Sequence, residues 1–162
     1  GGGGFETLGI DNVLLPDGER VAFARRRDLA RAEGSLDPES QSEAAQLAWH
    51  ISDDALARVN AHFGLIAEGM CGGAEEGEAR PRLLVVDELG RLELERGCGL
   101  VAATELLARG ATARFPHALA VVRDWLLPRA VERFGAAWGG ARAISPDDEA
   151  RGLLRAACGL AS

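Results

Sequence analysis

The sequence predicts an α/β domain with three layers, in which helices cover both faces of a mostly parallel β-sheet. Two apolar runs, residues 82–88 and 117–123, alternate with segments of helical periodicity. Runs of this kind are typical of strands buried on both faces of a parallel sheet. A third observation is the stretch 5–26, which contains two strand-like segments around a turn. It predicts an N-terminal β-hairpin and therefore some antiparallel pairing.

The hairpin is predicted from strands at residues 5–10 and 19–26, which flank the turn formers Pro16-Asp17-Gly18. Proline presets φ in such a turn and glycine tolerates a positive φ. The polar segment 32–43 that follows is rich in turn formers, so it is predicted to be a surface loop.

A helix is predicted to begin after Ser52, whose side chain can cap it. Apolar residues then recur at spacings of three and four and give one buried stripe: Leu56, Val59, Phe63 and Ile66. The segment 69–82 is predicted to be a solvated connector. Metal binding by its three glutamates, Glu75, Glu76 and Glu78, is the disfavoured alternative.

Three further helices and a short strand complete the prediction. The first helix covers residues 100–109 and is stopped by Gly110, and the second covers 124–135 with Pro128 in its first turn. A strand at 141–144 precedes the last helix, for which Ser145 is the expected N-cap and Leu153, Leu154 and Ala157 the buried face.

Length and composition are those of a soluble protein with one domain over residues 1–162. No apolar run is long enough for a bilayer span, and a net charge of −7 argues against nucleic acid as a partner. The three cysteines form no C-x-x-C pattern, which favours buried thiols in a reducing compartment. All 18 basic residues are arginine, so the chain contains no G-x-x-x-x-G-K-[ST] phosphate loop.

The most informative motif is the acidic pair that ends the first apolar run, Asp87 and Glu88. Polar residues often end buried strands simply because the chain must reach water. The pair also suits a nucleotide site: Asp87 can hold a water of a Mg²⁺ ion, and Glu88 can polarise a water that attacks the γ-phosphate.

The segment around this pair, "DELGRLEL" at residues 87–94, resembles the signature of the cancer-related nucleoside-triphosphatase family, which consists of small P-loop enzymes. All eight positions agree, and other segments before and after them resemble the family in the same order, so that the resemblance extends from Gly3 to about Phe134. The resemblance implies a RecA-like P-loop fold. It also implies hydrolysis of nucleoside triphosphates with magnesium in the cytoplasm, with Glu88 as the catalytic residue and Asp87 as the metal residue.

The front of the chain departs from the family, whose members begin with a strand, the phosphate loop and a helix. The sequence starts where that unit is expected to have ended. Truncation is the expected explanation for the missing unit, and a family member that has lost its activity is the less common one. Without the loop and its lysine, the chain alone is expected to hydrolyse nothing measurable. A truncated sheet would also expose an apolar face, and self-association is expected.

Other polar residues leave two interpretations open. Arg123 can bind a γ-phosphate or a base, or it can form an ion pair with Asp87 or Glu88. Glu93 can support the metal or play a structural role, and the structural role is favoured. The glycines at 97–99 can hold an anion at a helix N-terminus or form a tight turn.

The cluster of arginines at 25–31 is predicted to be a solvated edge rather than a phosphate patch. The three histidines, His50, His62 and His117, have no partner at ligand spacing and are predicted to be structural. The rival to an enzyme is a degenerate module without catalysis, which binds a protein or a nucleotide. A hydrolase that uses another metal is a third, weaker interpretation.

Overall fold

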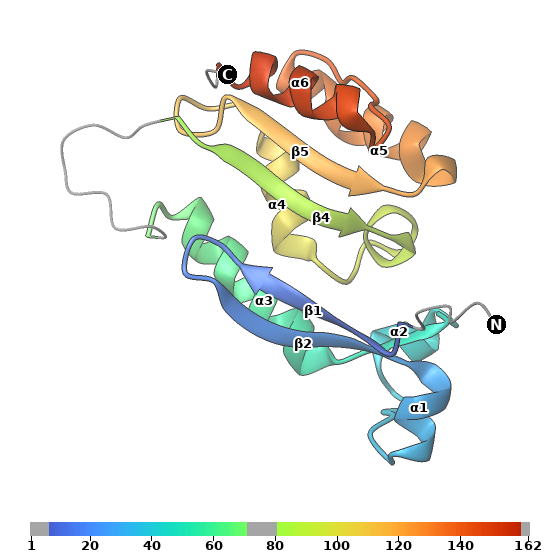
Figure 1. The fold of residues 1–162 in the computed structure, drawn as a ribbon. Helices are drawn as coiled ribbons and strands as arrows, with labels where there is room; N and C mark the ends of the chain where they lie inside the picture. The colour runs from blue at the N-terminus through green and yellow to red at the C-terminus, as the bar shows by residue number, and fades with distance from the viewer. Residues whose placement is uncertain (1–6, 71–80, 160–162) are drawn as a thin grey trace. The chain divides into compact units, whose positions relative to one another are not determined.

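The computed structural model describes residues 7–70 and 81–159 (Figure 1). The chain divides into two compact units. The first comprises residues 1–73 and 91–103, and the second comprises residues 74–90 and 104–162. The chain therefore passes from one unit to the other three times, at residues 73–74, 90–91 and 103–104.

The first unit contains a three-stranded antiparallel sheet of β1 (Gly9–Leu14), β2 (Glu19–Arg26) and β3 (Trp49–Ile51), in that order. The predicted hairpin is confirmed, with Gly18 at φ +74° in its turn. Its first strand lies later than the predicted 5–10, because Leu14 continues the strand and is buried at its end. The three-residue strand β3 was not predicted from the sequence.

Three helices accompany this sheet: α1 (Arg27–Ala32), α2 (Gln41–Ala44) and α3 (Asp53–Ala67). The prediction for α3 is confirmed, since the hydroxyl of Ser52 accepts a hydrogen bond from the Ala55 amide. The prediction for 32–43 is wrong at its end, where α2 forms and Ser42 is fully buried. The reason is that the Ser42 hydroxyl bonds to both backbone groups of Ile51 in β3.

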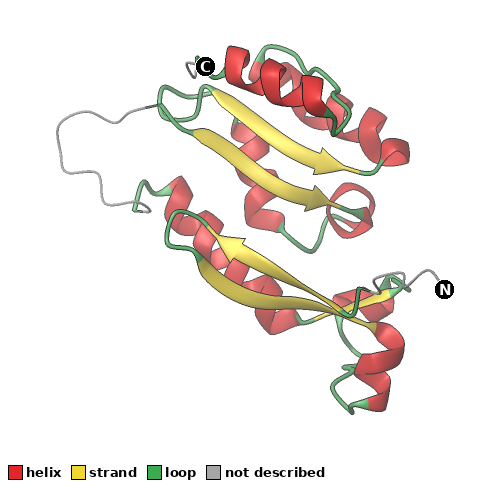
Figure 2. Ribbon diagram, in the orientation of Figure 1, coloured by secondary structure: helices red, strands yellow, loops and turns green. Residues whose placement is uncertain are grey.

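The second unit contains a parallel pair of strands, β4 (Leu83–Leu89) and β5 (His117–Val122), which point the same way in Figure 2. Both strands were predicted, but burial on both faces is wrong. Leu84 and Val86 are buried, whereas Val85 is 39% exposed and Val121 is 46% exposed. Val85 pairs with Leu119, two residues before Val121, so the exposed valines lie on one face of the pair.

In the sequence between β4 and β5, a one-turn π-helix, η1 (Leu92–Arg96), precedes α4 (Val101–Arg109). The predicted helix and its stop are confirmed, since Gly110 follows at φ +82°. The turn η2 (Asp124–Leu126) and the helix α5 (Leu127–Phe134) follow β5, and Pro128 lies in the first turn of α5 as predicted.

The end of the chain differs more from the prediction. After the short helix η3 (Gly135–Trp138), residues 141–144 form no strand. The helix α6 (Asp148–Ala157) is capped by Asp147, whose carboxylate accepts from the Ala150 amide, and not by Ser145. Leu153 and Leu154 are half-buried, but Ala157 is exposed.

The α/β class is therefore confirmed, whereas the strands form two separate sheets, of which only the smaller is parallel. The predicted connector at 71–80, with its three glutamates, lies outside the described residues. Among the helices that are described, none combines the length and the apolar character that crossing a membrane requires.

Candidate functional site

The acidic pair Asp87 and Glu88 lies in a bulge near the carboxyl end of β4. The register against β5 is regular from Leu83 to Val86 and shifts before Leu89, which pairs with Val122. The two acids occupy this interruption, and both side chains are exposed. Bulges often re-aim side chains next to active sites.

The backbone of Glu88 is unusual, because its φ of +63° falls in the left-handed region. This conformation costs a residue with a β-carbon roughly 1–2 kcal/mol, whereas glycine adopts it readily. The Glu88 side chain is exposed, so packing in the core does not offset this cost. Strain of this kind clusters at functional sites, so the conformation of Glu88 supports a function for its side chain.

Arg123 follows the last residue of β5 and reaches across to Glu88. Its Nε donates to Glu88 Oε1 at 2.9 Å, and both side chains are largely in contact with solvent. An exposed ion pair of this kind contributes only about 0–1 kcal/mol. Of the two roles left open for Arg123, the ion pair is present, and it is weak enough to exchange for a better anion.

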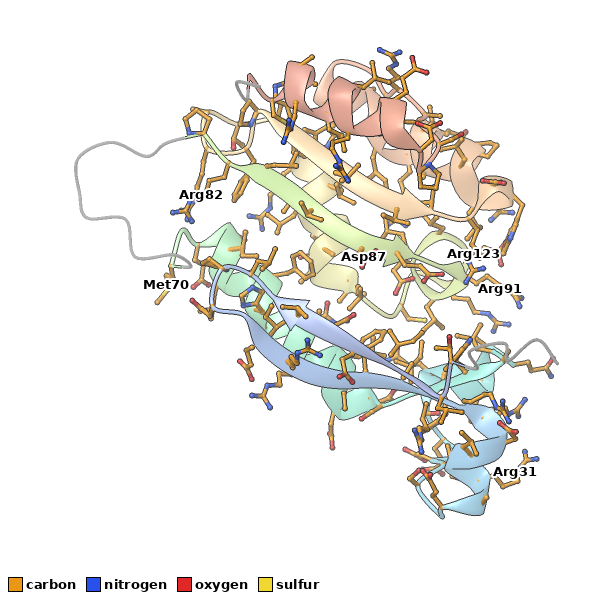
Figure 3. All side chains as sticks on the ribbon, in the orientation of Figure 1. Arg31, Met70, Arg82, Asp87, Arg91 and Arg123 are labelled. Carbon is orange, nitrogen blue, oxygen red and sulfur yellow. The ribbon has the colours of Figure 1, made fainter. Side chains whose placement is uncertain are left out.

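Among the described residues, the Asp87 carboxylate has no partner. Within the described parts of the chain it forms neither a hydrogen bond nor an ion pair, and Figure 3 shows it near the end of β4, with Arg123 beyond the end of β5. Mg²⁺ takes oxygen ligands and commonly uses only one or two carboxylates, with waters and phosphates completing the shell. The exposed Asp87 fits that role. Among the described residues, no group of three or more potential metal-ligating side chains was found.

The glycines at 97–99 belong to the first unit and form a tight turn before α4. The Gly99 amide donates to Gln41 Oε1 at 2.8 Å, and Asn60 Nδ2 donates to the Gly99 carbonyl at 2.8 Å. Asn60 Oδ1 also accepts from the Ala102 amide at 3.0 Å. We call Gln41, Asn60 and Glu93 the Gly99 clamp.

Glu93 completes the clamp, since its Oε1 accepts from the Leu100 amide at 2.9 Å. The Gly99, Leu100 and Ala102 amides at this helix N-terminus are thus occupied by side chains of the protein, which agrees with the tight turn. Glu93 is 6% exposed. This structural role agrees with the prediction, and it is played by a buried carboxylate rather than by an exposed one.

Three of the arginines in the cluster at 25–31 are neutralised by nearby carboxylates. Arg25 pairs with Glu33 at 2.6 Å, Arg26 with Asp28 at 2.5 Å and Arg27 with Glu43 at 2.5 Å. The hydrogen bond from Arg25, followed by its charge, holds the pKa of the Glu33 carboxyl below its usual range. These pairs agree with the predicted solvated edge and leave no open phosphate patch in this cluster.

Two of the three histidines bind backbone groups. His50 Nε2 accepts from the Asp37 amide at 3.5 Å, and His62 Nε2 lies 2.8 Å from the Leu15 carbonyl. Both are buried, which agrees with a structural role, while His117 is exposed. Cys98 and Cys158 are half-buried free thiols rather than buried ones.

Comparisons of this chain with protein-family models, with curated proteins and with solved structures found no match.

Proposed function

We propose that this chain carries the catalytic strand end of a magnesium-dependent nucleoside-triphosphatase, which hydrolyses a nucleoside triphosphate to the diphosphate and phosphate. The observation that carries the proposal is the bulge at the end of β4. It presents two adjacent carboxylates to solvent, with Glu88 in a strained backbone conformation. Ligands of α/β proteins bind beyond the carboxyl ends of the parallel strands, where these residues lie.

Each residue has a distinct role in this proposal. Asp87 would hold a Mg²⁺ ion through one of the waters bound to it, and the ion would supply positive charge at the phosphates. Glu88 accepts a proton from the attacking water as the new P–O bond forms and the bond to the diphosphate breaks. Arg123 binds the γ-phosphate, which competes for the guanidinium and thereby releases Glu88.

The sequence of the chain limits what it can do by itself. It contains no lysine, and hence no phosphate loop of the G-x-x-x-x-G-K-[ST] type. The backbone amides and the lysine of such a loop supply much of the charge stabilisation in phosphoryl transfer. The proposed P-loop fold and its activity therefore require a phosphate-binding segment that these 162 residues do not contain.

The test is magnesium-dependent phosphate release by the protein expressed from its complete reading frame, beside the 162-residue chain. We expect turnover by a protein whose reading frame includes a phosphate loop, near-complete loss in Glu88→Gln, and no turnover by the 162 residues alone. Glu105→Gln, which replaces an exposed glutamate of α4, is the matched control and retains activity. Turnover that survives Glu88→Gln would refute the assigned role.

A module without catalysis is the second candidate, and the absence of lysine favours it. In such a module the exposed Glu88–Arg123 pair is a permanent surface contact, and Asp87 has no metal. The two candidates differ in the phosphate-release assay. The genomic DNA also distinguishes them, since an in-frame G-x-x-x-x-G-K-[ST] upstream of the first codon supports the enzyme.

A further inference from the structure

The most exposed aromatic side chain among the described residues lies next to the proposed site. Trp125 is 59% exposed, whereas Trp49 and Trp138 are half-buried. Trp138 has a structural partner, because its Nε1 donates to the Leu107 carbonyl at 2.8 Å. Within the described parts of the chain, Trp125 forms no hydrogen bond or ring contact.

The backbone at Trp125 is held in a closed turn, although the indole ring is exposed. It is the middle residue of η2, and the Leu126 amide donates to the Arg123 carbonyl at 2.8 Å, which closes the turn. Leu126 is fully buried and fixes the turn to the core of its unit. The indole is therefore attached one turn of backbone from Arg123, the residue that contacts Glu88.

The residues that precede Trp125 in the chain include exposed apolar and charged side chains. Val121 is 46% exposed in the strand that leads to this turn, and Asp124 and Arg123 are exposed beside it. Removing the large apolar surface of an indole from water is favourable. A flat ligand that covers the exposed Trp125 ring would gain this free energy on binding. Arg123, two residues before Trp125, carries a guanidinium, so a ligand that reaches both residues is favoured by an anionic group.

A nucleotide has both parts, a flat base and an anionic phosphate chain. We propose that Trp125 is the base-stacking residue of this protein, and that it binds the base of the nucleoside triphosphate whose phosphates lie at Arg123 and Asp87. The proposal rests on the proposed function. Because every base has a π-face, stacking on Trp125 makes the site tolerant of different bases.

The experiment compares ligands that carry the base, the phosphates or both. The chain and its Trp125→Ala and Trp125→Phe variants are titrated with Mg²⁺ and ATP, with Mg²⁺ and tripolyphosphate, and with adenosine, by fluorescence and calorimetry. We expect ATP and adenosine to quench the emission of the native chain, whereas tripolyphosphate does not. Trp125→Ala is expected to weaken ATP binding by roughly 5- to 150-fold, as loss of one stacked base does.

Two controls isolate stacking from folding. Trp125→Phe keeps an aromatic ring and should retain most of the ATP affinity, and tripolyphosphate should bind the native chain and Trp125→Ala equally. Circular dichroism establishes that each variant is folded. CTP and GTP replace ATP in a parallel series, and we expect the same loss for both.

The outcomes separate this proposal from the proposed function. If tripolyphosphate binds with magnesium but Trp125→Ala binds ATP as well as the native chain, base stacking is overturned and the phosphate site stands. If adenosine quenches Trp125 while neither Asp87→Asn nor Glu88→Gln alters ATP binding, stacking stands and the phosphate site is overturned. Absence of any quenching at millimolar ATP and adenosine overturns stacking. A Trp125→Ala change that alters only self-association, measured by sedimentation, assigns the indole to a protein contact and also overturns it.

Discussion

Replacing Gly99 by alanine tests the clamp that precedes α4. An ideal β-carbon at Gly99 lies 2.1 Å from Glu93 Oε1 and 2.9 Å from the Leu92 β-carbon, and φ there is +76°. The positive φ costs alanine roughly 1–2 kcal/mol. The methyl group also displaces the Glu93 carboxylate from the Leu100 amide, and loss of a buried, charge-assisted hydrogen bond costs about 1.5–3 kcal/mol. We expect the free energy of unfolding to fall by about 3–5 kcal/mol.

Gly97 is a matched control in the same segment. Its φ is +66°, but a β-carbon there meets nothing within 4 Å, so Gly97→Ala reports the backbone cost alone. With an m-value of about 2 kcal/mol/M in urea, the midpoint should fall by about 0.5–1 M for Gly97→Ala and by about 2 M for Gly99→Ala.

Both variants are followed by the emission of Trp49, which lies in the first unit, in a background with phenylalanine at the other two tryptophans. In a Glu93→Ala background the excess cost of Gly99→Ala should shrink, because only the Leu92 contact remains. Equal midpoints for the two glycine variants would refute the reasoning.

Three further predictions follow from described contacts. Gly110→Ala should destabilise the second unit by about 3 kcal/mol or more in urea denaturation, since its β-carbon would lie 2.2 Å from the Ala137 carbonyl oxygen and φ is +82°. Asn60→Ala should cost about 2–3 kcal/mol by the same measurement, because it removes the acceptor of the Ala102 amide and one of the two donors to the Gly99 carbonyl, which keeps the Val101 amide. An unchanged midpoint would contradict the clamp. Burial, followed by the charge of Glu93, raises the pKa of the Cys98 thiol. Its contribution to stability is therefore present below the unfolded pKa and lost as pH rises through the folded value. Alkylation of Cys98 at pH 8.5, with the other two cysteines replaced by serine, should be slower in the folded chain than in urea, and equal rates would contradict the raised pKa.

Local signals in the sequence predicted α3, α4 and α5, but neither α1 nor α2. Ser52 caps α3, Gly110 follows α4 and Pro128 begins α5, as their positions indicated. Each of these depends on a few neighbouring residues and on backbone geometry that the residue type itself prefers. The failure of Ser145 as a cap has the same origin, since Asp147 offered a competing carboxylate two residues later.

Contacts between distant residues could not be predicted in this way. The burial of Ser42 depends on the backbone of β3, and the clamp joins Asn60 to Gly99 across 39 residues. The apolar run in β4 predicted the strand correctly. It did not predict which side chains are exposed, because exposure depends on whether other elements cover both faces of the strand. Val85 is consequently open where burial was expected.

In the candidate site, too, local features were predictable and features that depend on distant contacts were not. The position of Asp87 and Glu88 at the end of a parallel strand was predictable from the apolar run before them. The positive φ of Glu88 and the choice of Glu88 rather than Asp87 as the partner of Arg123 were not, because both depend on the register shift between β4 and β5.

The threefold passage of the chain between its two units bears on how such a protein can be inherited. Neither unit is one uninterrupted stretch of the gene, since residues 74–90 of the second unit lie between two parts of the first. A recombination event that exchanged residues 1–73 alone would separate Gln41 and Asn60 from Gly99, the residue that they hold. The two units are therefore expected to be gained, lost and shuffled together, as one evolutionary module.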